Sequence, residues 1–253
     1  MICFLEPEGA INQSSAVGTG GLTKEQQESL EIQIKVDVDK IKKEFAVLQT
    51  VIRLSLKEKG VTAQDVAAHV IGFGVSEADQ KKLETEQSLE KIFMLLTNYW
   101  SFLDCDLLDS IAEVYGSAED HRKMAEYQRK LRAFCKRRLS ETPKEMLLNL
   151  SNGSVQSHAS KRMTVKLNMS DPRLSVIKEI KATICKILNV KPEALVIKEI
   201  KRGCIEITYF ILESVSKVFI NKPLTKDQCD AFRAAAVLSL SCGHFQETFT
   251  VSL

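Results

Sequence analysis

The sequence is poor in the residues and motifs that mark most enzymes. It has only four histidines, and it lacks the G-x-S-x-G elbow of serine hydrolases, a Walker A phosphate loop and the H-E-x-x-H zinc motif. Gly18, Gly20 and Gly21 have no Lys-Ser pair after them, which a phosphate-binding loop requires. We therefore predict a protein that is not an enzyme, with no catalytic residues and no cofactor.

Cysteines in metal or disulfide patterns are also missing. The seven cysteines are an odd number, are widely spread and contain no C-x-x-C pair, which is typical of reduced, buried thiols in the cytoplasm. The nearest approach to a metal site is Cys242-Gly243-His244, with Cys229 as a third candidate ligand. A closed zinc site needs four ligands. No fourth ligand is evident, and we predict no metal.

Neither a long apolar segment nor a strong net charge is present. The most apolar stretch, residues 93–103, is interrupted by Asn98 and is about half as long as a bilayer requires. The first ten residues lack the basic region of a secretory signal. A net charge of +2 creates no overall attraction to nucleic acid or to anionic membranes. We expect a cytoplasmic protein that does not bind a membrane.

The first half has helical periodicity. No apolar repeat precedes Ile34, so residues 1–30 are predicted to be a disordered tail. After it, apolar residues recur at steps of three and four, beginning with Ile34, Val38, Ile41, Phe45, Leu48 and Ile52. Val47, Val51 and Leu54 widen this stripe, which favours burial in a bundle over a coiled coil. Several similar stripes follow, and we predict an all-α bundle of five or six helices over residues 31–140.

The second half has a different pattern. Residues 141–161 are predicted to form a short helix ending near Leu150 and a Ser-rich linker. Runs of alternating and β-branched residues, with helical repeats between them, then predict a small β-α-β-β-α-β sandwich over residues 162–243, followed by a C-terminal tail, residues 244–253. The predicted fold class is thus an all-α domain joined to an α+β domain.

An aromatic cluster is the best candidate for partner binding. Tyr99, Trp100 and Phe102 are the densest aromatic group of the chain. Three such positions on one helix cannot all face a core, and an outward aromatic ring is typical of interface anchors. We predict that one of them contacts a partner.

Carboxylates and basic residues give weaker candidates. Asp104, Asp106 and Asp109 could hold a cation, but a helix start attracts aspartates for capping, with Asp104 or Asp106 as the cap, and we favour that interpretation. Arg137-Arg138-Leu139-Ser140 resembles a basophilic kinase site, which makes Ser140 a possible phosphorylation site.

From residue 161 onward the chain has 15 basic and 9 acidic residues, and a basic surface is predicted at Lys178, Lys181, Lys201 and Arg202. The strand that begins at Arg202-Gly203 resembles the RNP1 motif of RNA-recognition domains. However, the positions where bases would stack hold Cys204 and Glu206 instead of aromatic residues. The sequence therefore disfavours nucleic acid as a partner.

Two segments carry a resemblance to known proteins. Residues 88–134, SLEKIFMLLTNYWSFLDCDLLDSIAEVYGSAEDHRKMAEYQRKLRAF, resemble a helical module of large invertebrate proteins that often lies beside death-fold or nucleotide-binding oligomerisation domains. KRGCIEITYFI and VLSLSCG resemble the small α+β module that commonly follows it, although Leu212 stands where a proline is expected. The resemblance spans residues 34–243 and implies an accessory module of apoptotic or innate-immune signalling, without catalytic residues.

Together these observations predict a non-enzymatic protein–protein interaction module, an adaptor or a piece of a scaffold. Its partners would be other proteins, including a second copy of itself. The alternative is binding of nucleic acid or another anionic ligand by the basic second half, and a third possibility is an enzyme whose site the sequence does not reveal.

Overall fold

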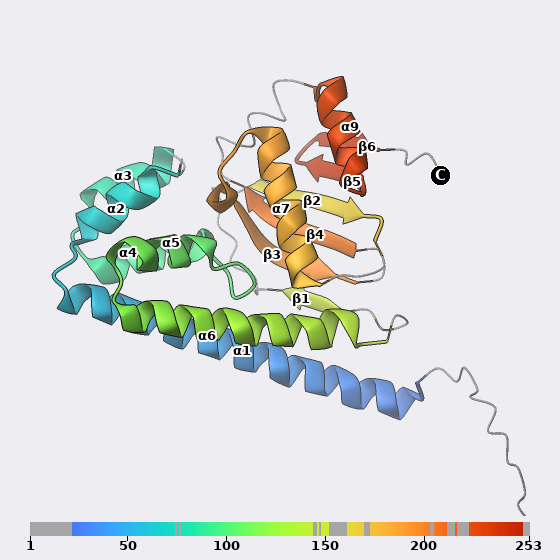
Figure 1. Cartoon of the computed structure of the whole chain (residues 1–253), viewed down its shortest axis with the longest axis horizontal. Helices are drawn as coiled ribbons and strands as arrows, with labels where there is room; N and C mark the ends of the chain where they lie inside the picture. Colours follow the sequence, from blue (N-terminus) through green and yellow to red (C-terminus); the bar gives the residue numbers. More distant parts are fainter. Residues whose placement is uncertain are drawn as a thin grey trace, which may run out of the picture.

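The structure is a computed structural model, and it describes residues 22–73, 75, 77–143, 146, 148–151, 161–169, 173–202, 205–211, 216 and 223–249. In the first half these residues form α-helices, a 3₁₀ turn (η1) and a π turn (η2). Their bounds are α1 Lys24–Glu58, α2 Ala63–Ile71, α3 Glu77–Thr85, α4 Leu89–Leu95, η1 Leu96–Asn98, α5 Asp106–Tyr115, α6 Ala118–Cys135 and η2 Lys136–Ser140. Helices α1 and α6 lie side by side, and α2 to α5 gather over one end of the pair (Figure 1).

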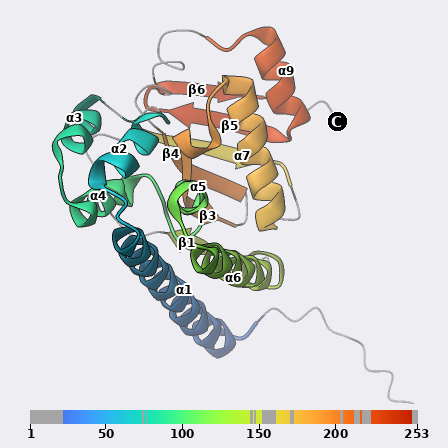
Figure 2. The same ribbon diagram turned by 60° about the vertical axis from the view of Figure 1, so that its left-hand side comes forward.

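The long helices α1 and α6 run antiparallel. Near its C-terminus α1 meets the start of α6, where the Ser55 hydroxyl donates to Asp120 at 2.5 Å. In the middle, the rings of Phe45 and Tyr127 lie 5.4 Å apart. The N-terminal part of α1 extends away from the rest of the molecule (Figure 2).

Helix α1 begins earlier than the sequence pattern suggested. Residues 24–30 were predicted to belong to the disordered tail, but they are helical. The cause is a capping box in which the Thr23 hydroxyl accepts from the Gln26 backbone and the Gln26 side chain accepts from the Thr23 backbone. Apolar periodicity does not detect such a helix start, because no side chain of α1 before Ile34 is fully buried.

The second half is built on a six-stranded antiparallel sheet with the order β1-β3-β4-β2-β5-β6. Its elements are β1 Asn149–Ser151, β2 Lys161–Leu167, α7 Leu174–Leu188, η3 Pro192–Ala194, β3 Leu195–Lys201, β4 Ile205–Ile211, α9 Lys226–Ala234, β5 Val237–Cys242 and β6 Phe245–Thr248. Helices α7 and α9 cover one face of the sheet (Figure 1). The predicted combination of helical and α+β structure is therefore confirmed at the level of fold class.

Both edge strands differ from the sequence prediction. The short helix expected to end near Leu150 is wrong there, because β1 pairs Leu150 with Ile200 of β3. The predicted C-terminal tail contributes β6, and Phe249 beyond it is buried with its ring 5.3 Å from that of Phe232. The Ser-rich stretch 152–160 lies outside the described residues.

The two halves share one hydrophobic core. A single cluster of buried side chains runs from α1, through the helices, to the sheet and α7. The sequence suggested two domains with separate cores, and this contact between them was not anticipated.

Candidate functional site

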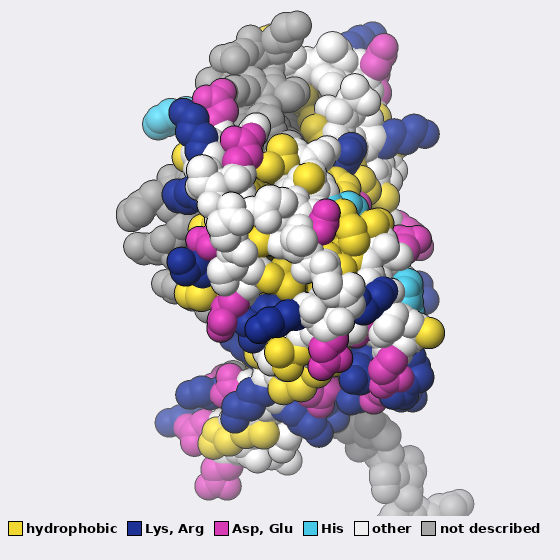
Figure 3. Space-filling model, turned by 90° about the vertical axis from the view of Figure 1, so that its left-hand side faces the viewer, with side chains coloured by type: hydrophobic (Ala, Val, Ile, Leu, Met, Phe, Trp, Pro, Cys, Tyr) yellow, Lys and Arg dark blue, Asp and Glu magenta, His cyan; other side chains and the backbone are white. Residues whose placement is uncertain are grey.

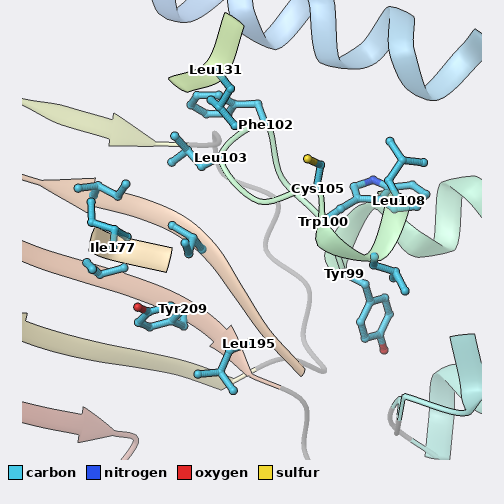
Figure 4. Close-up of a cluster of buried hydrophobic side chains, with 14 of the residues drawn as sticks. Tyr99, Trp100, Phe102, Leu103, Cys105, Leu108, Leu131, Ile177, Leu195 and Tyr209 are labelled. Atoms are coloured by element: carbon cyan, nitrogen blue, oxygen red, sulfur yellow. The ribbon is translucent and has the colours of Figure 1, made fainter. Parts of the chain in front are cut away.

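The aromatic cluster proposed as a partner contact is buried. Tyr99, Trp100 and Phe102 are 8%, 2% and 0% exposed, so the expectation that one ring faces outward is wrong. The error lies in the assumption of one continuous helix. The chain leaves α4 at Leu95, passes through η1 and forms a turn closed by a bridge between Ser101 and Asp104, which lets all three rings point inward (Figure 4).

Each ring has a partner inside the molecule. The Tyr99 hydroxyl donates to Asp79 at 2.5 Å, and Trp100 packs 5.4 Å from the ring of Phe93. The Phe102 ring lies 6.5 Å from that of Phe134 in α6, and the Phe102 carbonyl accepts a 2.6 Å hydrogen bond from the Tyr127 hydroxyl. This segment therefore organises the core of the helical half.

A buried ionic cluster joins this segment to the α+β half. Asp104 accepts from the Lys181 ammonium at 2.7 Å and from the Ile197 backbone at 2.9 Å. Asp106 accepts from Lys181 and from Lys178, both at 2.8 Å. Asp104 therefore pairs with α7, and at the start of α5 it accepts only a long bond, 3.4 Å, from the Asp106 backbone; the N-cap residue there is Cys105, which makes no side-chain capping bond. We call Asp104, Asp106, Lys178 and Lys181 the ionic junction.

The charges of the ionic junction stabilise one another. Burial would lower the pKa of Lys181, but Asp104 and Asp106 outweigh it and hold the pKa above its usual range. Burial would raise the pKa of Asp106, yet Lys181 and Lys178 hold it below its usual range. At Asp104, which is buried, the loss of hydration outweighs the attraction of Lys181 and raises the pKa of the carboxyl, so the compensation is incomplete there. Such an arrangement holds elements together and offers no free acid or base.

A second buried lysine lies beside the ionic junction. The Lys198 ammonium donates to the Trp100 carbonyl at 2.5 Å and to the Thr97 carbonyl at 3.3 Å, and it lies 5.2 Å from the centre of the Phe210 ring. Burial lowers its pKa to about 8. The Ser101 hydroxyl completes the contact by donating to the Ile197 carbonyl at 2.5 Å.

The predicted basic surface does not form. Lys181 is buried in the ionic junction, and Lys178 pairs with Asp106. Lys201 lies 3.2 Å from Glu206 and 3.6 Å from Glu199, while Arg202 is buried. The prediction that these four side chains present free positive charge on one surface is therefore wrong, because acidic neighbours or burial occupy them.

Ser140 is exposed at the end of η2, but its basic neighbours are engaged. Arg138 is buried in an ion pair with Asp37 of α1, and Arg137 lies 2.9 Å from the same carboxylate. Phosphorylation of Ser140 stays a prediction. A kinase that reads both arginines would have to break these ion pairs first.

An open groove with a volume of about 720 Å³ lies between α1 and α6, and no sequence prediction assigned it a role. Val36, Val47, Val51 and Leu48 supply its apolar lining on α1. Charged side chains border it on both helices, namely Asp39, Lys40, Lys43, Glu44, Lys123, Glu126 and Lys130. On the face shown in Figure 3, hydrophobic side chains likewise lie between acidic and basic ones near the long helices at the bottom of the view.

Part of the groove lining, Val47 and Val51, was assigned to a widened buried stripe by the sequence. Val47 and Leu54 were taken as a widening of the buried stripe, but they are exposed, by 62% for Val47. Ile32 and Val36 are exposed by 66% and 55%. On α1 these four side chains lie on a different side from the residues that the helix buries. The spacing of residues in the sequence already implies this difference, but the prediction of a broad buried stripe did not use it.

In the described part of the chain, no group of three or more His, Cys, Asp or Glu side chains is placed to hold a metal ion. The Cys242-Gly243-His244 segment forms the turn between β5 and β6. The cysteines that the structure describes are free thiols, and none of its helices is long and apolar enough to cross a membrane.

In comparisons with known proteins, no family model matches the chain, and no curated protein or solved structure is significantly similar to it.

Proposed function

We propose that this protein is a non-enzymatic interaction module, an adaptor or a piece of a scaffold, and that it docks protein partners in the groove between α1 and α6. The observation that carries the proposal is the second apolar stripe of α1, which includes Ile32, Val36 and Val47. More than half of each of these side chains is exposed to solvent.

Apolar side chains bordered by charges are the composition expected of a docking surface. The apolar centre gains free energy when a partner removes it from water, and the charged rim selects the partner and its orientation. A groove between two helices fits an amphipathic helix, whose apolar face would lie on the valines. The proposal therefore names a helical protein segment as the ligand.

Two finer expectations belong to the same proposal. We take the molecule to be a helical bundle of five or six helices combined with a β-α-β-β-α-β sandwich, working in the cytoplasm. The resemblance to modules beside death-fold or nucleotide-binding oligomerisation domains supports a role in signalling.

Binding of nucleic acid by the second half is the alternative function. The pairing of Lys178, Lys181 and Lys201 with acidic side chains gives it no support in the described residues. A free basic stripe is what such binding would require.

The proposal is tested by comparing three forms of the full chain as immobilised bait. They are the wild type, the variant Val36→Asp with Val47→Asp, and the control Val114→Asp, which changes an exposed valine of α5 outside the groove. We expect a protein that the wild type and the control retain and that the groove variant loses. Titration calorimetry with that purified protein should show at least about a hundredfold weaker binding to the groove variant, since interface energy is concentrated in a few buried side chains.

Equal retention of every partner by all three forms would remove the groove from the function. Retention of RNA that falls steeply with salt, unaffected by the groove variant, would favour the alternative.

A further inference from the structure

Helix α1 carries a regular stripe of side chains along the groove. The stripe consists of Val36, Lys40, Lys43, Val47 and Val51, at successive steps of four, three, four and four residues. Because successive residues of an α-helix are rotated by about 100°, these five side chains fall within an arc of about 80°. Each of them lines the groove. A ligand that lies along α1 in the groove therefore meets two lysines between apolar side chains.

The two lysines of the stripe have no counter-ion of their own. Within the part of the chain that the structure describes, neither the Lys40 nor the Lys43 ammonium takes part in an ion pair or a hydrogen bond, and both side chains are exposed. Their charges are therefore available to a ligand.

The carboxylates of the groove are mostly engaged by the molecule itself. Lys130 of α6 lies 3.3 Å from Glu44 and 3.1 Å from Glu126. Asp39, at the border of the stripe, is exposed and has no ion pair with another described residue. The free charges of the lining are thus two ammonium groups and one carboxylate, which leaves the groove positive.

The helices that form the groove extend this positive charge beyond its lining. Residues 118–140, which form α6 and η2, contain eight Lys and Arg but three Asp and Glu, whereas α1 has seven of each kind. The whole chain has a net charge of only +2, so its positive excess is concentrated on this pair of helices. Basic side chains accordingly gather around the long helices at the bottom of Figure 3, with acidic ones between them.

We propose that the ligand of the groove is an acidic amphipathic helix of a partner protein. This inference rests on the proposed function and adds the charge and the spacing of the ligand. Val36 and Val47 are 11 residues apart in the sequence, which is about 16 Å along a helix. Two apolar side chains of the partner at this spacing would cover them, and carboxylates between these two would lie opposite Lys40 and Lys43.

Other anionic ligands would use only part of this surface. A phosphate backbone would pair with the lysines but would leave the exposed valines in water. An anionic membrane would reach the lysines and the exposed valines. It would not reach Leu48 and Tyr127, which also line the groove but are buried. A helix is narrow enough to enter between α1 and α6 and to contact both kinds of side chain.

The probe is a synthetic helical peptide of about 16 residues with leucines at positions 2 and 13, glutamates at positions 6 and 9, and alanine or glutamine elsewhere. Its pattern is symmetric and therefore matches the stripe in either direction. A second peptide has lysines in place of the glutamates. A third has the two glutamates at positions 4 and 11, on the opposite face of the helix.

Binding of the labelled peptides to the full chain is measured by fluorescence anisotropy. We expect the acidic peptide to bind at least about tenfold more tightly than the lysine peptide at low salt, because two attractions replace two repulsions. The ratio should shrink at about 0.2 M salt, since exposed charges are screened. The third peptide should lose most of the advantage of the first. Equal affinity for all three peptides, or no binding of the acidic one, would overturn the inference.

Substitutions in the chain assign the preference to the stripe. Lys40→Glu with Lys43→Glu should reverse the order of the acidic and lysine peptides. The matched control is Lys81→Glu with Lys226→Glu, which makes the same change of charge at exposed lysines outside the groove and should keep the order of the wild type. Val36→Asp with Val47→Asp should bind neither peptide. An unchanged order in the Lys40 and Lys43 variant would refute the proposed contact.

Two further ligands are tested in the same way. They are poly-uridine RNA and vesicles of phosphatidylcholine with phosphatidylserine. If either binds the wild type more tightly than the acidic peptide does and is lost from Val36→Asp with Val47→Asp, the groove serves that ligand and the inference is wrong.

These outcomes are distinguishable from failure of the proposed function. A captured partner that is lost from the Val36 and Val47 variant but is retained fully by the Lys40 and Lys43 variant would refute the acidic ligand and leave the docking function intact. If neither the peptides nor any captured partner respond to the Val36 and Val47 variant, both proposals fail.

Discussion

A buried lysine with little acidic compensation has an energetic cost, and Lys198 is the clearest case. Its ammonium is held by the carbonyls of Trp100 and Thr97, which are dipoles and not full charges. Lys181 lies among two carboxylates and keeps its proton more strongly than a free lysine, whereas burial lowers the pKa of Lys198 to about 8. The two lysines are therefore expected to affect stability in opposite directions as the pH rises.

The lowered pKa of Lys198 predicts that the free energy of unfolding increases with pH. Below pH 8 it carries a proton in both the folded and the unfolded chain, and the folded state bears the full cost of burying the charge. Between pH 8 and about 10.4 the unfolded chain binds the extra proton, so the contribution of Lys198 to the free energy of unfolding rises by up to about 3 kcal/mol.

The measurement is urea unfolding of the wild type and of Lys198→Met from pH 7 to pH 10.5. The difference between them isolates this lysine from the cysteines and other lysines that titrate in the same range. A difference that stays constant with pH would show that Lys198 does not titrate as its burial implies.

At the scale of elements, two glycines end helices for different physical reasons. Gly60 follows α1 in a left-handed conformation, φ +75°, and the hydrogen bonds from Gly60 to Lys57 and from Val61 to Leu56 close a Schellman motif. Gly116 follows α5 with an ordinary φ, but a Cβ there would lie 2.3 Å from the Ala112 carbonyl oxygen. The first glycine is needed for its backbone angle and the second for its close approach.

This difference predicts which of the two glycine-to-alanine substitutions lowers the free energy of unfolding more. Gly60→Ala has open space and should cost about 1 kcal/mol of unfolding free energy, the usual cost of a left-handed alanine. Gly116→Ala must displace backbone and should cost about 2 kcal/mol or more. Thermal unfolding of both variants tests the order, and a larger loss for Gly60→Ala would contradict the steric argument.

Element type was largely readable from the sequence, because periodicity and capping act locally. The stripe from Ile34 to Ile52 and the strands around Val165 and Ile207 follow from side chains near one another in the chain. The errors arise where a distant segment decides the outcome. Leu150 joins a strand because Ile200 offers an edge, and Trp100 turns inward because the helix breaks before it.

The functional candidates failed for the same reason. From the sequence alone Lys181 is interpreted as a surface charge, because the sequence does not show that Asp104, 77 residues away, lies beside it. Val47 is interpreted as a core residue from its spacing, because the sequence does not show that α6 contacts a different face of α1. Pairing between distant residues is the information that one sequence does not display.

For the whole molecule, the ionic junction ties the stability of the two halves together. Lys181 on α7 and Ile197 on β3 both bind Asp104, which lies next to the rings that organise the helical half. Separating the two halves would break these hydrogen bonds and ion pairs. The shared hydrophobic core acts in the same direction.

We therefore predict that the two halves unfold in one transition. Trp100 is the only tryptophan and lies at the contact, so its fluorescence reports the helical half, while far-ultraviolet circular dichroism reports the whole chain. The two signals should coincide in urea. Lys181→Met should shift both together by about 3 kcal/mol, because it leaves Asp104 buried without a countercharge.

Lys178→Met provides the matched control, since Lys178 is one-third exposed and Asp106 keeps Lys181 as a partner. It should cost less than 1 kcal/mol, in line with ion pairs open to water. Two separated transitions in the wild type, or a Lys181→Met variant in which only the circular dichroism signal shifts, would mean that the halves are independent domains. In that case the groove of α1 and α6 would have to be stabilised by the helical half alone.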